Sequence, residues 1–378
     1  MTSALPDIPM ADLASGLAEL RTEIDQAIAR VVNSGGFILG EEVTGFETEF
    51  ARYVDTKHAV GLNSGTDALI IGLTALSLSA DDEVITSPFT FVASASSILH
   101  AGAIPVFADI DPVTYALDPA SVEQLVTERT KAIVVVHLFG RPADLSSLQA
   151  LATKHGIALV EDTAQALGSR HEGKMLGSLG LFGTHSFFPS KNLGAFGDGG
   201  MLVTNDDALA HRVRVLRGHG ASRKYFNEFL GYNSRLDAIQ AAVLRVKLPH
   251  LDRAIATRRA VAQRYEHALH GAPNISTPCG GTVHSCQSHS FHQYTIRLST
   301  PRKRDLVRGR LAAEGIATAI YYPTPLHETP LFGQYATVAL PEAERAARHV
   351  LSLPIWPAMS HKQQDRVTAA LLTAVEAS

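Results

Sequence analysis

The feature that most constrains the fold is an alternation of short apolar runs with helix-length amphipathic segments between residues 60 and 204. The runs are Glu83–Ser87, Ile104–Ala108, Ala132–Leu138, Ile157–Val160, His185–Phe188 and Met201–Thr204. Apolar strands separated by helices are typical of a parallel sheet that is buried on both faces. The alternation predicts an α/β protein whose large domain has three layers around a mostly parallel sheet.

A change of architecture is expected near Pro249. This proline interrupts the helical pattern of Leu236–Leu248, and a second helical stretch covers Leu251–Leu269. The pattern beyond it predicts strand, helix, strand and helix, over Phe291–Leu298, Lys303–Glu314, Ile316–Tyr321 and Gln363–Ala377, with Gly315 as a helix stop. We therefore expect a large domain over residues 1–249 and a smaller α+β domain over residues 250–378.

Composition excludes several classes of protein. A net charge of −4 in 378 residues lacks the basic excess of a nucleic-acid binder. No long uncharged apolar window suggests a membrane span, and Met1–Met10 does not resemble a signal peptide. The 17 histidines lack the paired spacing of a metal site. Cys279 and Cys286 are too few for a zinc site or a disulfide framework, so we expect reduced thiols and a cytoplasmic location.

A lysine follows one apolar run at a position where its amine could be desolvated. Lys191 comes after the run His185–Phe188 and before a glycine-rich segment. Most lysines are solvated surface groups, which is the default interpretation of a lone one. Burial at a strand end would instead lower the lysine pKa and free the amine to attack an aldehyde, as Schiff-base formation requires. Lys191 is therefore a candidate cofactor anchor.

Two adjacent carboxylates end the run Ile157–Val160. Successive side chains of a strand point to opposite faces, so one of Glu161 and Asp162 can face a site there. Acids at strand ends also serve as ordinary helix caps. If the aldehyde that Lys191 attacks belongs to a cofactor with a pyridine ring, a carboxylate beside the ring nitrogen would keep that nitrogen protonated, which makes the ring an electron sink. We predict that Asp162 has this role and that Gln165 contacts the hydroxyl group of the same cofactor ring.

A small polar turn, Asn63–Asp67, precedes an expected helix at Ala68–Leu76. Such a turn can cap the helix, which is the more frequent role, or bind phosphate at the helix N-terminus. The four glycines of Gly194–Gly200 could suggest a dinucleotide loop, but they lead into a strand rather than a helix. The first turn is therefore a candidate phosphate site only in combination with the other motifs, and we discount a dinucleotide site at the second.

Taken together, these motifs resemble the DegT/DnrJ/EryC1/StrS family of sugar aminotransferases, which have the fold of type I pyridoxal-phosphate enzymes. The resemblance extends from Gly36–Gly40 through the three motifs and Gly231–Asp237 to Ser352–Pro354. It implies pyridoxal phosphate as cofactor, with pyridoxamine phosphate as its intermediate form. Lys191 would attach the cofactor and shuttle a proton, and Asp162 would pair with the ring nitrogen.

The resemblance also implies further contacts. Phe91 and Ala164 would enclose the ring, and Gln165 would contact the ring oxygen. The phosphate would be held by Gly65, Thr66 and Ser186. Asn233 would reach the phosphate in the neighbouring subunit, so that a homodimer shares its active sites. The sequence pattern alone singles out three residues of a later loop, Tyr321, Tyr322 and His327. It fits substrate contacts and packed loop aromatics equally well.

The activity implied is transfer of an amino group, usually from L-glutamate, to a nucleotide-linked keto-sugar, with carbon 3 favoured over carbon 4. An aminocyclitol aminotransferase is a near alternative. Sugar dehydratases of the same fold place histidine where this chain has Lys191, and a regulator without turnover would be expected to lose Lys191 or Asp162. Thr163, where alanine is frequent, could face either the acceptor or the interior of the fold.

Overall fold

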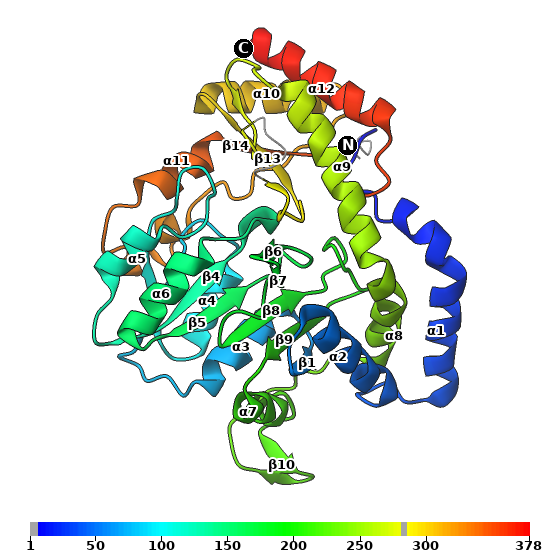
Figure 1. Cartoon of the computed structure of the whole chain (residues 1–378), viewed down its shortest axis with the longest axis vertical. Helices are drawn as coiled ribbons and strands as arrows, with labels where there is room; N and C mark the ends of the chain where they lie inside the picture. The colour runs from blue at the N-terminus through cyan, green and yellow to red at the C-terminus, as the bar shows by residue number, and fades with distance from the viewer. Residues whose placement is uncertain (1–6, 281–285) are drawn as a thin grey trace.

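A computed structural model of the chain describes residues 7–280 and 286–378. At its centre lies a seven-stranded sheet (Figure 1). In sheet order its strands are β1 (His58–Leu62), β9 (Gly200–Thr204), β8 (Phe182–Ser186), β5 (Ala158–Asp162), β4 (Thr130–Val136), β2 (Glu83–Thr86) and β3 (Ile104–Phe107). β9 runs antiparallel to both of its neighbours, and the other pairings are parallel. The expected mostly parallel sheet is confirmed.

Helices cover both faces of this sheet, which gives the expected three layers. Strand alternation separates the faces, because Ala132 and Val134 of β4 pack into one core cluster and Ile133 and Val135 into another. The first face carries α3 (Gly65–Ala75), α4 (Ala93–His100) and α7 (Asp207–Arg217). The other carries α5 (Pro119–Leu125) and α6 (Leu145–His155), with α2 (Glu41–Val54) and α8 (Ala238–Lys247) in an adjoining cluster.

A smaller antiparallel sheet follows, made of β12 (Ile275–Ser276), β13 (Tyr294–Leu298) and β14 (Val350–Leu353). Its helices are α9 (Leu251–Leu269), α10 (Pro301–Ala313), α11 (Pro341–His349) and α12 (His361–Glu376). The strand expected at Ile316–Tyr321 is wrong, because this stretch forms isolated bridges at Ile316 and Ala319, and β14 takes the place beside β13. The boundary at Pro249 stays a prediction; the chain passes there through a 3₁₀ turn, Leu248–His250, into α9.

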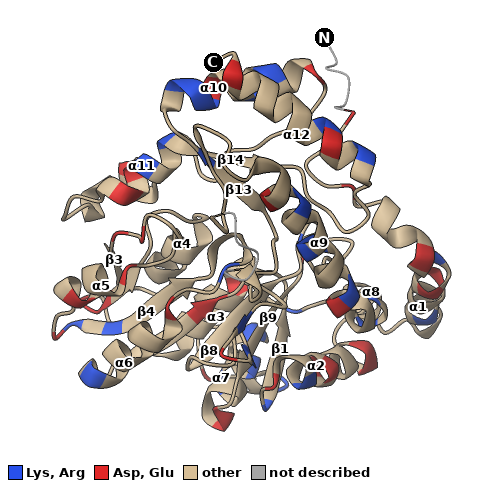
Figure 2. Ribbon diagram, turned by 45° about the horizontal axis from the view of Figure 1, so that its top comes forward, with Lys and Arg blue, Asp and Glu red and all other residues tan. Residues whose placement is uncertain are grey.

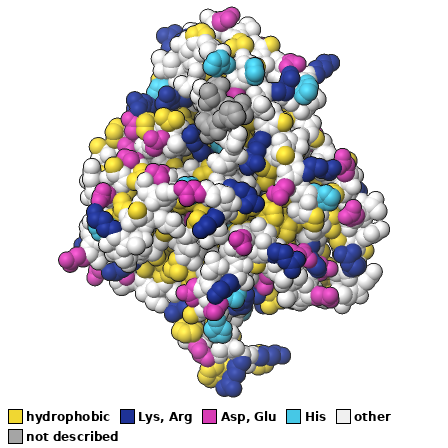
Figure 3. Space-filling model, viewed as in Figure 1, with side chains coloured by type: hydrophobic (Ala, Val, Ile, Leu, Met, Phe, Trp, Pro, Cys, Tyr) yellow, Lys and Arg dark blue, Asp and Glu magenta, His cyan; other side chains and the backbone are white. Residues whose placement is uncertain are grey.

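The remaining elements lie around these two sheets. They are the 3₁₀ turns Ser15–Leu20, Leu138–Gly140, Leu326–Glu328 and Gly333–Tyr335, helix α1 (Arg21–Ser34), and the hairpins β6 (Arg170–His171) with β7 (Lys174–Met175) and β10 (Ala221–Arg223) with β11 (Phe226–Asn227). The β10–β11 hairpin projects from the body (Figures 1 and 3). Charges of both signs are interspersed along α1 and α11 (Figure 2). Among the described residues, no helix has the length and apolarity to cross a membrane.

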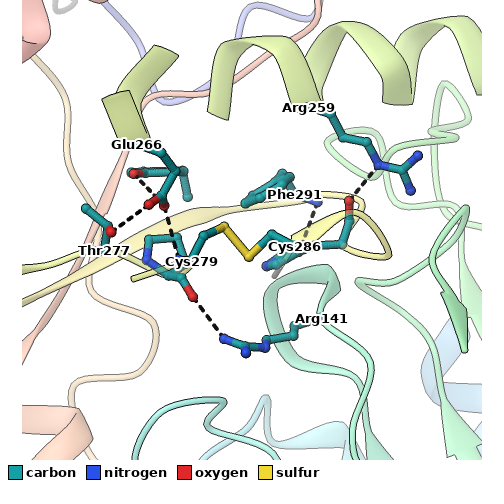
Figure 4. The surroundings of a disulfide bond; sticks show 10 residues. Arg141, Arg259, Glu266, Thr277, Cys279, Cys286 and Phe291 are labelled. Atoms are coloured by element: carbon teal, nitrogen blue, oxygen red, sulfur yellow. Dashed lines mark hydrogen bonds between the residues drawn. A yellow bond between two sulfur atoms is a disulfide. The ribbon is translucent and has the colours of Figure 1, made fainter. Parts of the chain in front are cut away.

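The two cysteines correct one expectation. Cys279 and Cys286 form a disulfide, with Cα atoms 5.7 Å apart, so the expected reduced thiols are wrong (Figure 4). Both residues are buried in the core of the smaller sheet, where the backbone N–H of Cys279 donates to Glu266 at 3.2 Å. The short spacing in sequence gave no indication that the fold brings their Cα atoms within bonding range.

Candidate active site

A cavity of about 510 Å³ opens where the strands β4, β5 and β8 end, the usual position of a ligand site in a parallel sheet. It brings together residues from widely separated parts of the chain. Those predicted from the sequence are Gly65, Thr66, Phe91, Asp162, Ala164, Gln165, Ser186, Lys191, Tyr321 and Tyr322. The sheet therefore assembles the three motifs into one site.

Lys191 lies in a turn beyond β8, in which its backbone N–H donates to the Phe188 carbonyl at 2.8 Å. The expected strand His185–Phe188 is displaced, because β8 begins at Phe182 and ends at Ser186. The lysine side chain nevertheless enters the cavity. Burial lowers the pKa of Lys191 to about 8, and the negative charge of Asp162 opposes this shift in part. A large fraction of the amine is thus unprotonated, and nucleophilic, at a mildly alkaline pH.

Asp162 is the last residue of β5 and is buried. Its Oδ1 accepts from the backbone N–H of Ala164 at 3.1 Å, and its Oδ2 accepts from the hydroxyl of Ser94 at 2.7 Å. These contacts fix the carboxylate at the cavity wall. An ionised carboxylate has about four acceptor positions, so capacity for a further donor remains.

Glu161 faces the opposite side of β5, as strand alternation requires. It accepts from the backbone N–H groups of Gly177, Leu179 and Gly180 at 2.7–2.8 Å, and from His137 Nε2 at 3.2 Å. His137 Nδ1 accepts an N–H, so Nε2 carries the proton. Burial opposes ionisation of Glu161, but these hydrogen bonds hold its pKa below the usual range. Glu161 is a structural anchor.

Gln165 and Thr163 take opposite directions from the same segment. The Gln165 side-chain oxygen accepts from the N–H of Phe139 at 2.7 Å, and its amide nitrogen donates to the Tyr322 hydroxyl at 3.0 Å. Gln165 and Tyr322 both line the cavity. Thr163 points into the fold, where its hydroxyl donates to the Thr184 carbonyl at 2.6 Å and lies 2.7 Å from His185 Nδ1. Burial lowers the pKa of His185 to about 3, so its ring is neutral.

The polar turn before α3 is both a helix cap and one wall of the cavity. Ser64 is the N-cap, and its hydroxyl accepts from the Asp67 N–H at 3.0 Å. The first N–H groups of a helix have no acceptor inside it, and here they belong to Gly65 and Thr66 at the cavity. A Cβ on Gly65 would lie 2.8 Å from that of Ser186. Glycine therefore lets β8 approach the turn closely enough for both to contact one ligand.

Several further side chains line the cavity that sequence patterns did not single out. They include Thr90, Arg258 and His292. Burial and the charges of Lys191 and Arg258 hold the pKa of His292 well below the usual range, so its ring is neutral. Its Nδ1 is buried and has no hydrogen-bond partner among the described residues. Arg258 donates to the backbone oxygens of Phe291, His292 and Ile355. A histidine in a strand-forming segment gave no sequence signal for this placement.

Two of the expected site residues lie elsewhere. Asn233 is exposed, bridges to Gly218 and accepts from Arg235 at 2.5 Å. His327 is buried, and its Nε2 lies 3.7 Å from Glu344 rather than at the cavity. An Asn233 that serves a neighbouring subunit has to lie outside the cavity of its own chain, as it does here. The role itself stays a prediction.

The sequence model of the DegT/DnrJ/EryC1/StrS aminotransferase family matches residues 18–372. The chain belongs to this family. It is similar to a "pleiotropic regulatory protein" of Geobacillus stearothermophilus, at 49% identity over 96% of both chains. It is also similar to a UDP-N-acetyl-3-dehydro-α-D-glucosamine 3-aminotransferase of Acidithiobacillus ferrooxidans, at 45% identity over 96% of this chain and 97% of the other.

Among solved structures, it is similar to S. venezuelae DesV in complex with a ketimine intermediate. The TM-score is 0.93, with 44% identity over 98% of this chain and 99% of the other. These findings confirm the expected fold and the expected pyridoxal-phosphate-dependent aminotransferase activity. The cavity fits that cofactor, because it combines a helix N-terminus for the phosphate, a carboxylate for the ring nitrogen and a lysine with a lowered pKa.

Proposed function

We propose that this aminotransferase moves an amino group from L-glutamate to carbon 3 of a nucleotide-linked keto-sugar. The observation that carries the proposal is the placement of Lys191, with its lowered pKa, in one cavity with Asp162 and the turn at Gly65. The acceptor is proposed from relatives, because the Acidithiobacillus protein is named for amination at carbon 3 of a UDP-sugar. An aminocyclitol acceptor stays an alternative.

In this proposal each residue has a defined task. When bound, pyridoxal phosphate supplies an electron sink and carries the amino group between the two substrates. Lys191 would hold the cofactor through its Nζ, and the same amine would serve as the group that moves a proton. The Asp162 carboxylate would accept the N–H of the ring nitrogen and so keep that nitrogen protonated. Gln165 contacts the ring oxygen and is itself oriented by Phe139 and Tyr322.

The remaining contacts position the cofactor. Gly65, Thr66 and Ser186 would donate to the phosphate, and Ala164 and Phe91 would enclose the ring. Phe91 is 53% exposed, and its ring centroid lies 6.3 Å from that of Tyr322. The two aromatic rings therefore lie near each other at the cavity wall, and in this proposal Tyr321 and Tyr322, which both line the cavity, contact the acceptor.

A homodimer with shared active sites is part of the proposal. The projecting β10–β11 region carries exposed apolar side chains: Tyr225, Phe226, Phe229 and Leu230. Figure 3 shows apolar and basic side chains together on this projection. Exposed apolar patches of this kind are typical of protein contacts. Asn233 follows the projection in sequence and lies outside the cavity of its own chain. This supports a role in the cavity of the partner.

Subunit mixing tests this arrangement. If Asn233 completes the site of the partner chain, a heterodimer of Lys191→Ala and Asn233→Ala chains has one intact site and one site that lacks both residues. Random reassociation then restores about a quarter of wild-type activity, because half of the dimers have one of two sites intact. An Asn233 that acts within its own chain leaves both sites of the heterodimer defective, so that the absence of restored activity would contradict the shared site.

A regulator without turnover is the second candidate, favoured by the name of the Geobacillus relative. The presence of both Lys191 and Asp162 in the cavity argues against it. Transamination predicts an absorbance band from lysine-bound cofactor that is lost in Lys191→Ala, and parallel double-reciprocal lines in steady-state kinetics. Screening nucleotide sugars with glutamate, with products detected by mass, identifies the acceptor. A wild-type protein that lacks the band when supplied with cofactor would overturn the proposal.

A cytoplasmic location also stays a proposal. It was expected from reduced cysteines, whereas the structure holds a disulfide. Disulfides are rare in the cytosol of most organisms. The location therefore rests on the nucleotide-sugar substrates of the relatives and not on the state of the cysteines.

A further inference from the structure

Behind the cavity wall lies a hydroxyl that no sequence motif singled out. Ser94 is on α4, is completely buried, and its Oγ is 2.7 Å from Oδ2 of Asp162. The hydroxyl of Thr90, also buried, is 3.0 Å from the same Oγ. The three side chains therefore form one hydrogen-bonded row that ends at the carboxylate.

The number of protons fixes the direction of this row. A carboxylate can only accept, so the single O–H proton of Ser94 is donated to Asp162. Ser94 Oγ can then act only as an acceptor toward Thr90, which must be the donor of the second hydrogen bond. Both bonds point toward Asp162, and such chains of hydrogen bonds strengthen one another at low dielectric.

The row also determines how the carboxylate is turned. Its Oδ1 is held by the backbone N–H of Ala164 at 3.1 Å, and its Oδ2 by Ser94. With one donor on each oxygen, rotation of the Asp162 side chain breaks at least one of these two hydrogen bonds. Without Ser94, Oδ2 has no described protein donor and the group can turn away from the cavity.

We propose that Ser94, supported by Thr90, is a positioning residue that orients the Asp162 carboxylate and so keeps the ring nitrogen of the cofactor protonated. The proposal rests on the proposed pairing of Asp162 with that nitrogen. Ser94 is not among the residues that line the cavity, so in this proposal it acts on the cofactor through Asp162. A merely structural serine would affect folding but would not change the protonation of the cofactor.

The test measures ring-nitrogen protonation directly, in holoenzyme prepared with ¹⁵N-labelled pyridoxal phosphate. In Ser94→Ala the ¹⁵N shift should move toward the unprotonated value between about pH 6 and 9, while the wild type stays protonated. The dissociation constant of the cofactor should rise about tenfold, the usual effect of losing one hydrogen bond to a charged group. Thr90→Val should change both quantities in the same direction by a smaller factor.

Matched variants separate the outcomes. Ser94→Thr keeps the hydroxyl and should restore the wild-type shift. Ser97→Ala removes another buried hydroxyl of α4, which donates to the Ser94 carbonyl at 3.3 Å and not to Asp162, and should leave the shift unchanged. A wild-type ¹⁵N shift in Ser94→Ala would overturn the proposal if Asp162→Asn abolishes protonation. A wild-type shift in Asp162→Asn as well would instead overturn the proposed role of Asp162.

Discussion

The lowered pKa of Lys191 makes a prediction about stability that needs no substrate. In the cofactor-free protein at pH 7, the lysine is protonated both in the folded and in the unfolded chain. Its pKa is about 8 when folded, against 10.5 for the free side chain. A tenfold change in a proton-binding constant corresponds to about 1.36 kcal/mol, so burial of this charge destabilises the fold by about 3 kcal/mol. Lys191→Met, which keeps the apolar stem, should therefore be more stable than the wild type by about this amount.

The stability difference between the two proteins should also depend on pH. Between pH 8 and 10.5 the unfolded chain binds more protons at this site than the folded chain, so wild-type stability rises relative to the variant. The advantage of Lys191→Met should fall from about 3 kcal/mol at pH 7 to about 2 kcal/mol at pH 9 and to less than about 1 kcal/mol at pH 10.5. Denaturant unfolding of both cofactor-free proteins across this range measures the difference.

Two controls distinguish this effect from general ones. Exposed Lys362 replaced by Met should change stability by less than about 0.5 kcal/mol at every pH. Saturation with pyridoxal phosphate should remove the advantage, because the wild type alone can bind the cofactor covalently. A Lys191→Met protein that is less stable than wild type at pH 7, or a difference independent of pH, would refute the inference that desolvation lowers this pKa.

Three further outcomes follow from the structure. Gly65→Ala should weaken cofactor binding about tenfold in a fluorescence titration, because its Cβ would crowd Ser186; unchanged affinity would contradict the close approach. Glu161→Gln should lower the free energy of unfolding by about 3 kcal/mol yet keep the cofactor absorbance band. Loss of the band with unchanged stability would instead place Glu161 in the site. Cys279 and Cys286 should resist alkylation until reduction, which should cost about 2 kcal/mol of stability; two thiols titrating in the untreated protein would be inconsistent with the disulfide.

Much of the large sheet was predictable, because strands buried on both faces leave continuous apolar runs in the sequence. What failed depended on partners that are distant in sequence. Met201–Thr204 was recognised as a strand, but its antiparallel direction is decided by pairing with β1 and β8. Ile316–Tyr321 has the composition of a strand, but it meets β14 only at a single bridge between Ala319 and Ser352, whereas β14 pairs along its length with β13. Composition does not decide which of two such segments pairs continuously.

The site was predictable where a motif is contiguous in sequence. Lys191 and Gly65 were found from their local surroundings, and both line the cavity. Ser94 was not, because its partner Asp162 lies 68 residues away and a serine inside a short helix has no distinctive pattern. His292 is similar, since its relation to the cavity depends on how the segment before β13 lies against the distant turn Leu138–Gly140, where the Gln293 N–H donates to the Phe139 carbonyl. Residues that orient others therefore escape a sequence search more readily than residues that touch the ligand.

The pair Glu161–Asp162 shows how one strand serves stability and chemistry together. Alternation turns Glu161 inward, where three backbone N–H groups and His137 satisfy its charge, and this fixes the end of β5 against the turn that follows β7. The next side chain, Asp162, is thereby held at the cavity with a fixed backbone. Its two neighbours, Ser94 and Ala164, then have to orient only the carboxylate. An acid placed one residue earlier or later would exchange these roles, so the register of β5 is as important to the active site as the identity of Asp162.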